Sequence, residues 1–167
     1  AQGSDNVYCV ALGTGIGGAY FSHGQLQSGA HGNANSIGYT LYDFDNATNY
    51  EQRAATLSLQ ARLKPYGVSV IEAFSQAKQG DELLSTVIHD WAETVASGLA
   101  PVILLLDPEI LIIGGAVSKQ GQYLLDLLTP AIDQLLPPHF RETDLKVAAL
   151  GNDAQLIGAV AQHLEKK

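Results

Sequence analysis

A cluster of glycines between two strand-like segments constrains this sequence most. Asn6–Leu12 is rich in β-branched and aromatic residues, and 19–22 reads as a second strand. The run 13–18 between them reads GTGIGG, which fits the pattern G-x-G-x-x-G. A dinucleotide-binding loop would open a helix at the third glycine, and a Walker phosphate loop would continue with Gly-Lys-Ser/Thr. Neither follows, so the segment predicts a β-hairpin with a glycine-rich turn.

Two glycine segments are candidates for binding phosphates or a ligand. Glycines let the backbone approach phosphate oxygens, and successive N–H groups form an anion cradle, to which the hydroxyl of Thr14 adds a donor. Gly114 and Gly115 follow the apolar run 110–113, and ligands bind at the C-terminal ends of strands in α/β sheets. The alternatives are an ordinary glycine-rich turn in the hairpin and tight strand-to-helix packing at Gly114 and Gly115.

The remaining sequence predicts helices and strands in alternation. Further strands are expected over 25–27, 110–113 and 145–150, an extended segment over 37–42, and loops over 28–35 and 43–49. Helices are expected over 51–63, Val70–Lys78 after the cap Ser69, 81–106 with Pro101 inside, 118–136 begun by Ser118, and 154–164. This order predicts an α/β domain in which an antiparallel hairpin unit joins parallel strands with helical crossovers.

Composition excludes several classes of protein. Of 167 residues, 46% are hydrophobic and 16% charged, which is typical of a folded domain with a core. The net charge of −8 argues against a nucleic-acid or anionic-membrane surface. A single cysteine, Cys9, excludes a disulfide framework and a multi-cysteine zinc site. With no leader-like or membrane-spanning run, we expect one cytoplasmic domain; the absence of Met indicates a piece of a longer chain.

Four ordered segments match known motifs. They are LGTGIGG at 12–18, GAHG at 29–32 with IGY at 37–39, DPE at 107–109 running to GGAVS at 114–118, and GNDA at 151–154 with LIGA at 156–159. In this order they resemble the second phosphate motif, the sugar-side loop, the adenosine-side segment and the closing segment of the ROK family (repressor, open reading frame, kinase). The resemblance implies the actin/hexokinase-like ATPase fold, with 1–167 as the C-terminal lobe of a two-lobe sugar kinase.

This resemblance also implies roles for individual residues. It assigns ATP binding to Gly13, Thr14, Gly15, Gly114 and Gly115, with Mg²⁺ bridging the phosphates. It assigns sugar contacts to Glu51, Ser36, His31 and Tyr39. The first phosphate motif and the Asp that acts as general base would belong to an N-terminal lobe absent from this chain, which alone would catalyse nothing. A homodimer is expected.

Departures from the family pattern leave alternatives open. Ser36 stands where family kinases have Glu, and Tyr39 stands where they have His. The cysteine-rich zinc segment is replaced by the short stretch 43–49, so we expect no zinc. Glu51 aligns with a second sugar-contacting Glu, although a carboxylate is also favoured at the start of a helix. Two other hypotheses remain. The chain could belong to a ROK-type sugar-sensing transcriptional regulator without kinase activity, and only then would nucleic acid be a partner. It could also be a structural or dimer-forming module.

Overall fold

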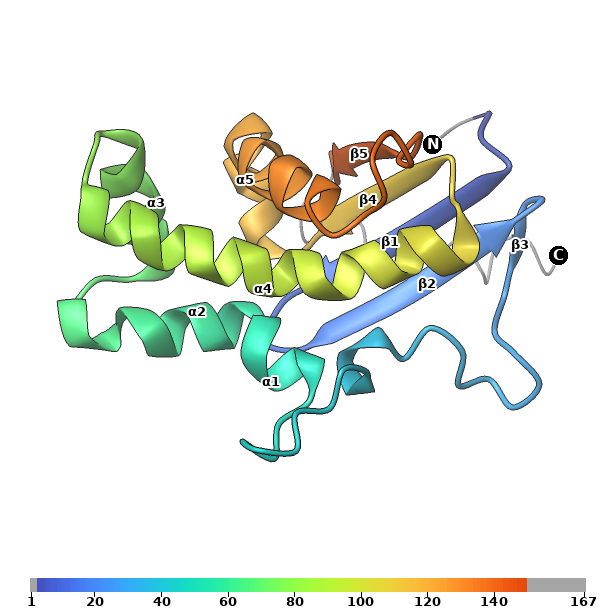
Figure 1. The fold of residues 1–167 in the computed structure, drawn as a ribbon, viewed down its shortest axis with the longest axis horizontal. Coiled ribbons are helices and arrows are strands. Elements are labelled where there is room, and N and C mark those ends of the chain that lie inside the picture. The colour runs from blue at the N-terminus through green and yellow to red at the C-terminus, as the bar shows by residue number, and fades with distance from the viewer. Residues whose placement is uncertain (1–2, 150–167) are drawn as a thin grey trace, which may run out of the picture.

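A five-stranded mixed sheet forms the base of the molecule in the computed structural model, which describes residues 3–149 (Figure 1). Its strands are β1 Asn6–Leu12, β2 Ile16–Ser22, β3 Gln25–Leu26, β4 Ile110–Gly114 and β5 Asp144–Val147. The order is β3-β2-β1-β4-β5, antiparallel from β3 to β1 and parallel from β1 to β5. This confirms the predicted α/β class, the hairpin and the parallel strands joined by helices.

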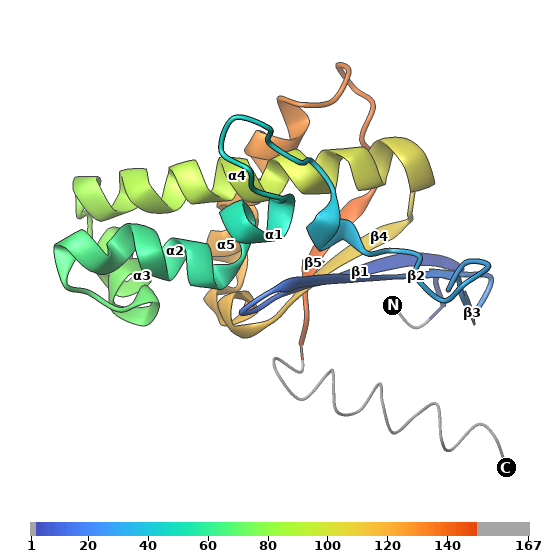
Figure 2. The ribbon, with the colours of Figure 1, turned by 90° about the horizontal axis from the view of Figure 1, so that it is seen from below.

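Helices α1 and α4 cover one face of the sheet, and α2 and α3 extend past its hairpin end (Figures 1 and 2). The helices are α1 Tyr50–Ala54, α2 Thr56–Leu63, α3 Val70–Lys78, α4 Glu82–Leu106 and α5 Gln122–Asp133, with 3₁₀ turns η1 Ile37–Tyr39, η2 Lys64–Tyr66 and η3 Ala116–Gln120. The Ser69 and Asp81 side chains cap α3 and α4, as predicted. Helix α4 continues through Pro101 and ends where Asp107 adopts a left-handed conformation.

The hydrophobic core lies between the sheet and α4. Alternate residues of β1 (Tyr8, Val10 and Leu12) belong to the core, as the two-residue period of a strand requires. Helix α4 contributes a buried stripe that includes Trp91, whose ring meets Phe74 of α3 edge to face at a centroid distance of 6.3 Å. Burial of this apolar surface fixes α4 on the sheet, and α1 is placed against α4 in turn.

Two predicted elements near the hairpin differ from the structure, the first by a break and the second in kind. The single helix over 51–63 is interrupted at Ala55, which is extended (φ −60°, ψ 158°), because the Thr56 amide that follows donates to the Gly13 carbonyl at 2.9 Å. The segment 37–42 forms no strand: it begins with the 3₁₀ turn η1 at Ile37–Tyr39, in which Ile37 and Gly38 are buried against neighbouring segments. Tertiary contacts override local propensity at both places.

Further differences concern the second half of the chain. Ser118 does not cap a helix over 118–136, because its hydroxyl donates to the Gly115 carbonyl at 2.7 Å within η3; Gly121 (φ 62°, ψ −132°) then separates η3 from α5. The last strand is Asp144–Val147 rather than 145–150. The predicted helix over 154–164 and the closing motif lie outside the described residues. Among helices within 3–149, none is long and apolar enough to cross a membrane.

Candidate functional site

The hairpin turn, residues 13–15 between β1 and β2, is held by its own backbone and by the start of α2. The Gly13 amide donates to the Gly15 carbonyl at 2.9 Å. From α2, the Thr56 amide donates to the Gly13 carbonyl at 2.9 Å, and the Thr56 hydroxyl donates to the Leu12 carbonyl at 3.1 Å. Thr14 remains exposed at the tip. The turn is therefore fixed through its carbonyls and presents Thr14 to solvent.

The end of β4 packs directly against the same hairpin. Gly115 has a φ of 92°, and a Cβ there would lie 2.1 Å from the Leu12 carbonyl oxygen. Only glycine allows this close approach. A Cβ on Gly114 would lie 3.5 Å from the Val10 oxygen, which is ordinary contact. The two predicted nucleotide-binding segments thus meet in space, and close packing alone is sufficient to require glycine at Gly115.

Glu51 of α1 also contacts the hairpin. Its Oε2 accepts a hydrogen bond from the Ile16 amide at 2.7 Å, immediately after the hairpin turn. Asn49 caps α1 in a capping box with Gln52, which sets the start of the helix one residue before Glu51. The half-buried carboxylate of Glu51 therefore joins α1 to the first residue of β2.

Buried contacts with α4 fix α1 itself. The Tyr50 hydroxyl donates to the Val95 carbonyl at 2.6 Å, and the Trp91 indole N–H donates to the Ala54 carbonyl at 2.9 Å. Gly98 makes room for the Tyr50 ring, since a Cβ there would lie 2.2 Å from its Cζ. Burial raises the pKa of Tyr50, so the hydroxyl stays a donor. Glu51 lies between these two anchors and has little freedom to move away from the hairpin.

The sugar-side loop, residues 28–39, runs along β2 and exposes most of its side chains. The Asn35 side chain donates to the Gln27 carbonyl at 2.8 Å, and a Cβ on Gly18 of β2 would lie 2.8 Å from the Asn35 oxygen. The Ser36 hydroxyl donates to the Asn33 carbonyl at 2.8 Å. The loop thus packs its main chain closely on the strand that leaves the hairpin turn.

Three residues of the sugar-side loop that were predicted to contact a sugar are exposed. They are His31, Ser36 and Tyr39, and Tyr39 is 77% exposed on η1. Glu51 approaches this loop at η1, where a Cβ on Gly38 would lie 3.1 Å from its Oε2. His31 takes part in none of the hydrogen bonds found within residues 3–149. The structure therefore brings Glu51, η1 and the hairpin turn together, and leaves His31 in the exposed part of the loop.

The aromatic loop, residues 40–48, is held by Arg53. The Arg53 guanidinium donates to the Thr48 carbonyl at 2.9 Å and to the Leu41 carbonyl at 2.5 Å, and it lies 4.0 Å from the Asp43 carboxylate. Hydrogen bonds from the side chain and backbone of Asn46 hold the pKa of Asp43 below its usual range. These contacts order a segment at the position where the family resemblance places a zinc segment.

Two exposed aromatic rings lie on the aromatic loop. Tyr42 and Phe44 meet edge to face at a centroid distance of 5.0 Å, and Phe44 is 87% exposed.

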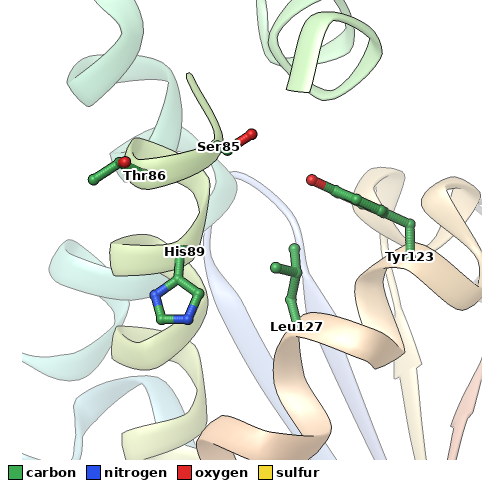
Figure 3. Close-up of a pocket in the computed structure, with 5 residues that line it drawn as sticks. All are labelled: Ser85, Thr86, His89, Tyr123 and Leu127. Atoms are coloured by element: carbon green, nitrogen blue, oxygen red, sulfur yellow. The ribbon is translucent and has the colours of Figure 1, made fainter. Parts of the chain in front are cut away.

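A separate groove lies between α4 and α5 (Figure 3). It is lined by Ser85, Thr86 and His89 from α4 and by Tyr123 and Leu127 from α5. His89 also belongs to a group of exposed candidate metal ligands with Asp90 and Glu93. No residue predicted to bind nucleotide or sugar lines this groove, so it is not the predicted site.

Sequence reasoning assigned no contact role to three residues that hold the site together. Thr56 follows two alanines inside a helix-like pattern, so nothing in the sequence marks the break that frees its amide. Arg53 lies two residues after Glu51 and reads as an ordinary exposed helix cation. Gly38 carried a usable signal, because an isolated glycine between Ile37 and Tyr39 indicates close backbone approach.

Comparison with known proteins places these motifs in one family. The family model described as "ROK family" matches residues 1–166. A glucokinase from Thermotoga maritima is 25% identical over 185 aligned residues, which cover 96% of this chain and 58% of that protein.

Two solved structures show the same arrangement. A ROK family glucokinase from Streptomyces griseus, in complex with glucose and AMPPNP, superposes with a TM-score of 0.84 at 27% identity, over 95% of this chain and 60% of that one. A ROK family transcriptional regulator homologous to the E. coli MLC protein shares the fold alone, with a TM-score of 0.75 at 21% identity over 87% of this chain and 42% of that one. This chain spans less than two thirds of the length of each of these relatives. Because the family model matches residues 1–166, the chain belongs to the ROK family.

Proposed function

We propose that this chain is the C-terminal lobe of an ATP-dependent sugar kinase that phosphorylates a hexose or hexose derivative. The observation that carries the proposal is the position of Glu51, which hydrogen-bonds the strand leaving the glycine turn and also lies against the sugar-side loop. One carboxylate thus adjoins both the phosphate-binding and the sugar-binding segments expected of a ROK kinase. The glucokinase relatives, one of them solved with glucose and AMPPNP, support this assignment.

On the nucleotide side, the hairpin turn would bind the phosphates of ATP. The Gly13 carbonyl is occupied by the Thr56 amide and the Gly15 carbonyl by the Gly13 amide, while Thr14 is exposed and its hydroxyl is free to donate to a phosphate oxygen. Gly114 would let the adenosine lie against the end of β4, and Gly115 would serve mainly to hold that end against Leu12. Main-chain groups fixed in this way are preorganised, which favours phosphoryl transfer because that reaction depends on the positioning of the reacting groups.

Toward the sugar, Glu51 would accept hydrogen bonds from sugar hydroxyls through Oε1, since Oε2 is engaged by the Ile16 amide. Exposed side chains of the sugar-side loop, at His31, Ser36 and Tyr39, would add contacts. Ser36 and Tyr39 replace the acid and imidazole of other family members. We therefore propose that sugar recognition here depends more on Glu51 than it does in members that keep both groups.

The rest of the reaction would depend on a second lobe. An Asp of an N-terminal lobe would take the proton from the attacking hydroxyl, and closure of the two lobes would exclude water. Mg²⁺ would neutralise charge on the ATP phosphates. The carboxylate at the hairpin, Glu51, already accepts a hydrogen bond from the Ile16 amide, so we assign the ion to the phosphates rather than to a residue of this chain. The protein is proposed to act in the cytoplasm as a homodimer.

A sugar-sensing regulator is the second candidate. Ser36 favours it, because this position carries no carboxylate and its hydroxyl is turned onto the Asn33 carbonyl of its own loop. A regulator would bind the sugar without transferring a phosphoryl group. Its full-length chain would carry a DNA-binding helix-turn-helix ahead of the two lobes.

An ADP-production assay separates the two candidates. The full-length protein would be supplied with ATP, Mg²⁺ and a panel of hexoses, N-acetylhexosamines and β-glucosides. We expect sugar-dependent ADP release with at least one of them. ADP release that stays at background with every sugar, although a sugar still binds by calorimetry, would reject the kinase and support the regulator.

A further inference from the structure

Glu51 occupies a junction between two segments that are distant in sequence. A Cβ on Gly15 of the hairpin turn would lie 2.5 Å from Glu51 Oε2, and a Cβ on Gly38 of η1 would lie 3.1 Å from the same oxygen. The Gly38 Cβ would also lie 2.6 Å from the Ile16 carbonyl oxygen. Both glycines therefore leave space that the carboxylate and the start of β2 fill. A side chain at either position would displace the junction.

The two oxygens of the Glu51 carboxylate have different surroundings. Oε2 accepts the Ile16 amide at 2.7 Å, a charge-assisted hydrogen bond at a half-buried position. Oε1 accepts no hydrogen bond from any group within residues 3–149. Because Tyr50 and Ala54 fix α1 on α4, the carboxylate can turn about its own bonds but cannot leave the junction. A group bound at Oε1 therefore acts on the same carboxylate that holds the Ile16 amide through Oε2.

We infer that Glu51 is a positioning residue that couples the two substrates of the proposed kinase. A sugar hydroxyl bound at Oε1 would orient the carboxylate, and Oε2 would in turn fix the Ile16 amide and the phosphate-binding turn just before it. Coupling of this kind is reciprocal: a nucleotide on the turn would raise the affinity for sugar by the same factor. The inference rests on the proposed function, but it assigns Glu51 a role toward the nucleotide that a plain sugar contact lacks.

The affinity of a nucleotide analogue in the absence of sugar is the decisive measurement. In the full-length protein we expect Glu51→Ala to weaken binding of a non-hydrolysable ATP analogue about tenfold, because the hydrogen bond that positions Ile16 is lost. Glu51→Gln keeps an acceptor oxygen for Ile16, so its analogue affinity should stay within about threefold of wild type. Both variants should raise the KM for sugar.

Two further variants test whether a loss of analogue binding comes from the junction itself. Gly38→Ala removes no carboxylate but places a methyl group against the Ile16 carbonyl and Glu51, and it should weaken binding of the analogue in the absence of sugar. Glu82→Ala removes a different first-turn glutamate, the exposed one of α4, and should leave analogue binding unchanged. Together they separate loss of the junction from loss of a helix-terminal charge.

Opposite results would overturn the inference. If Glu51→Ala and Gly38→Ala keep wild-type affinity for the analogue while Glu51→Ala raises the sugar KM, Glu51 is a sugar contact and nothing more. If wild type binds the analogue but releases no ADP with any sugar, the proposed function fails, while the analogue affinities still report on Ile16. Adding sugar should strengthen analogue binding in wild type and not in Glu51→Ala; equal strengthening in both would also reject the coupling.

Discussion

The hairpin turn and the aromatic loop lie on opposite sides of α1 and are held in different ways. Figure 2 shows α1 between the aromatic loop and the sheet. The turn is fixed by main-chain bonds and by glycine packing against Leu12 and Glu51. The aromatic loop is closed by a two-way main-chain bridge between Asp43 and Thr48 and is tied to α1 by the side chain of Arg53, while Phe44 lies in solvent. A turn packed through its glycines tolerates few sequences, whereas the exposed rings of Tyr42 and Phe44 can be exchanged without breaking the bonds that hold their loop.

The largest effect should come from filling the space behind the hairpin turn. We expect Gly115→Ala to lower the free energy of unfolding by about 3 kcal/mol, because φ is 92° and the new Cβ would overlap the Leu12 carbonyl. Urea unfolding measures this. Gly17→Ala, where a Cβ meets nothing within 4 Å, should change stability by less than about 0.5 kcal/mol. Equal effects of the two variants would mean that the close packing at Gly115 is unimportant.

A smaller effect is expected where α1 is anchored. Tyr50→Phe removes the hydroxyl that donates to the Val95 carbonyl, and the loss of this buried hydrogen bond should destabilise the protein by about 1 kcal/mol. Thermal unfolding gives the value. Tyr66→Phe, at a 41% exposed tyrosine of η2, is the matched control and should be neutral. A neutral Tyr50→Phe would show that ring packing alone holds α1.

On the aromatic loop, local order should change more than global stability. Arg53→Ala should lower the free energy of unfolding by less than about 1 kcal/mol but should open residues 40–48 to cleavage after Tyr42 or Phe44. Limited digestion with a protease that cleaves after aromatic residues tests this. Arg53→Lys loses the planar guanidinium whose two nitrogens contact Thr48 and Leu41 separately, and it should restore little protection. Unchanged digestion in both variants would show that the loop does not depend on Arg53.

The smallest effect lies in neither region and depends on pH. Arg141 hydrogen-bonds Asp133 at 2.6 Å and holds the pKa of that carboxyl below its usual range. The folded pKa is lowered, so the stabilisation is present above the ordinary value of about 4 and is lost as pH falls through the folded value. Asp133→Asn should remove about 0.5 kcal/mol at pH 7 and nothing at pH 2. A difference that persists at pH 2 would contradict this cause.

The sequence predicted the parts of the fold that have local causes. Capping residues at Ser69 and Asp81, the strand at Asn6–Leu12 and the glycine hairpin all follow from residue chemistry at those positions. The site was only partly predictable. Glu51 was found by family resemblance, but its bond to Ile16, 35 residues away, has no local signal. The helix break at Ala55 could not be predicted for the same reason, because it depends on the hydrogen bond from the Thr56 amide to the distant Gly13 carbonyl.

Helix α1 sets a fixed spacing between two contacts with one hairpin. Glu51 binds the Ile16 amide and Thr56 binds the Gly13 carbonyl, on either side of the turn and near the two ends of a five-residue helix. One inserted residue would rotate the following contact by about 100° around the helix axis and detach it. Insertions and deletions should therefore be tolerated before Asn49, in the aromatic loop, and selected against between 51 and 56.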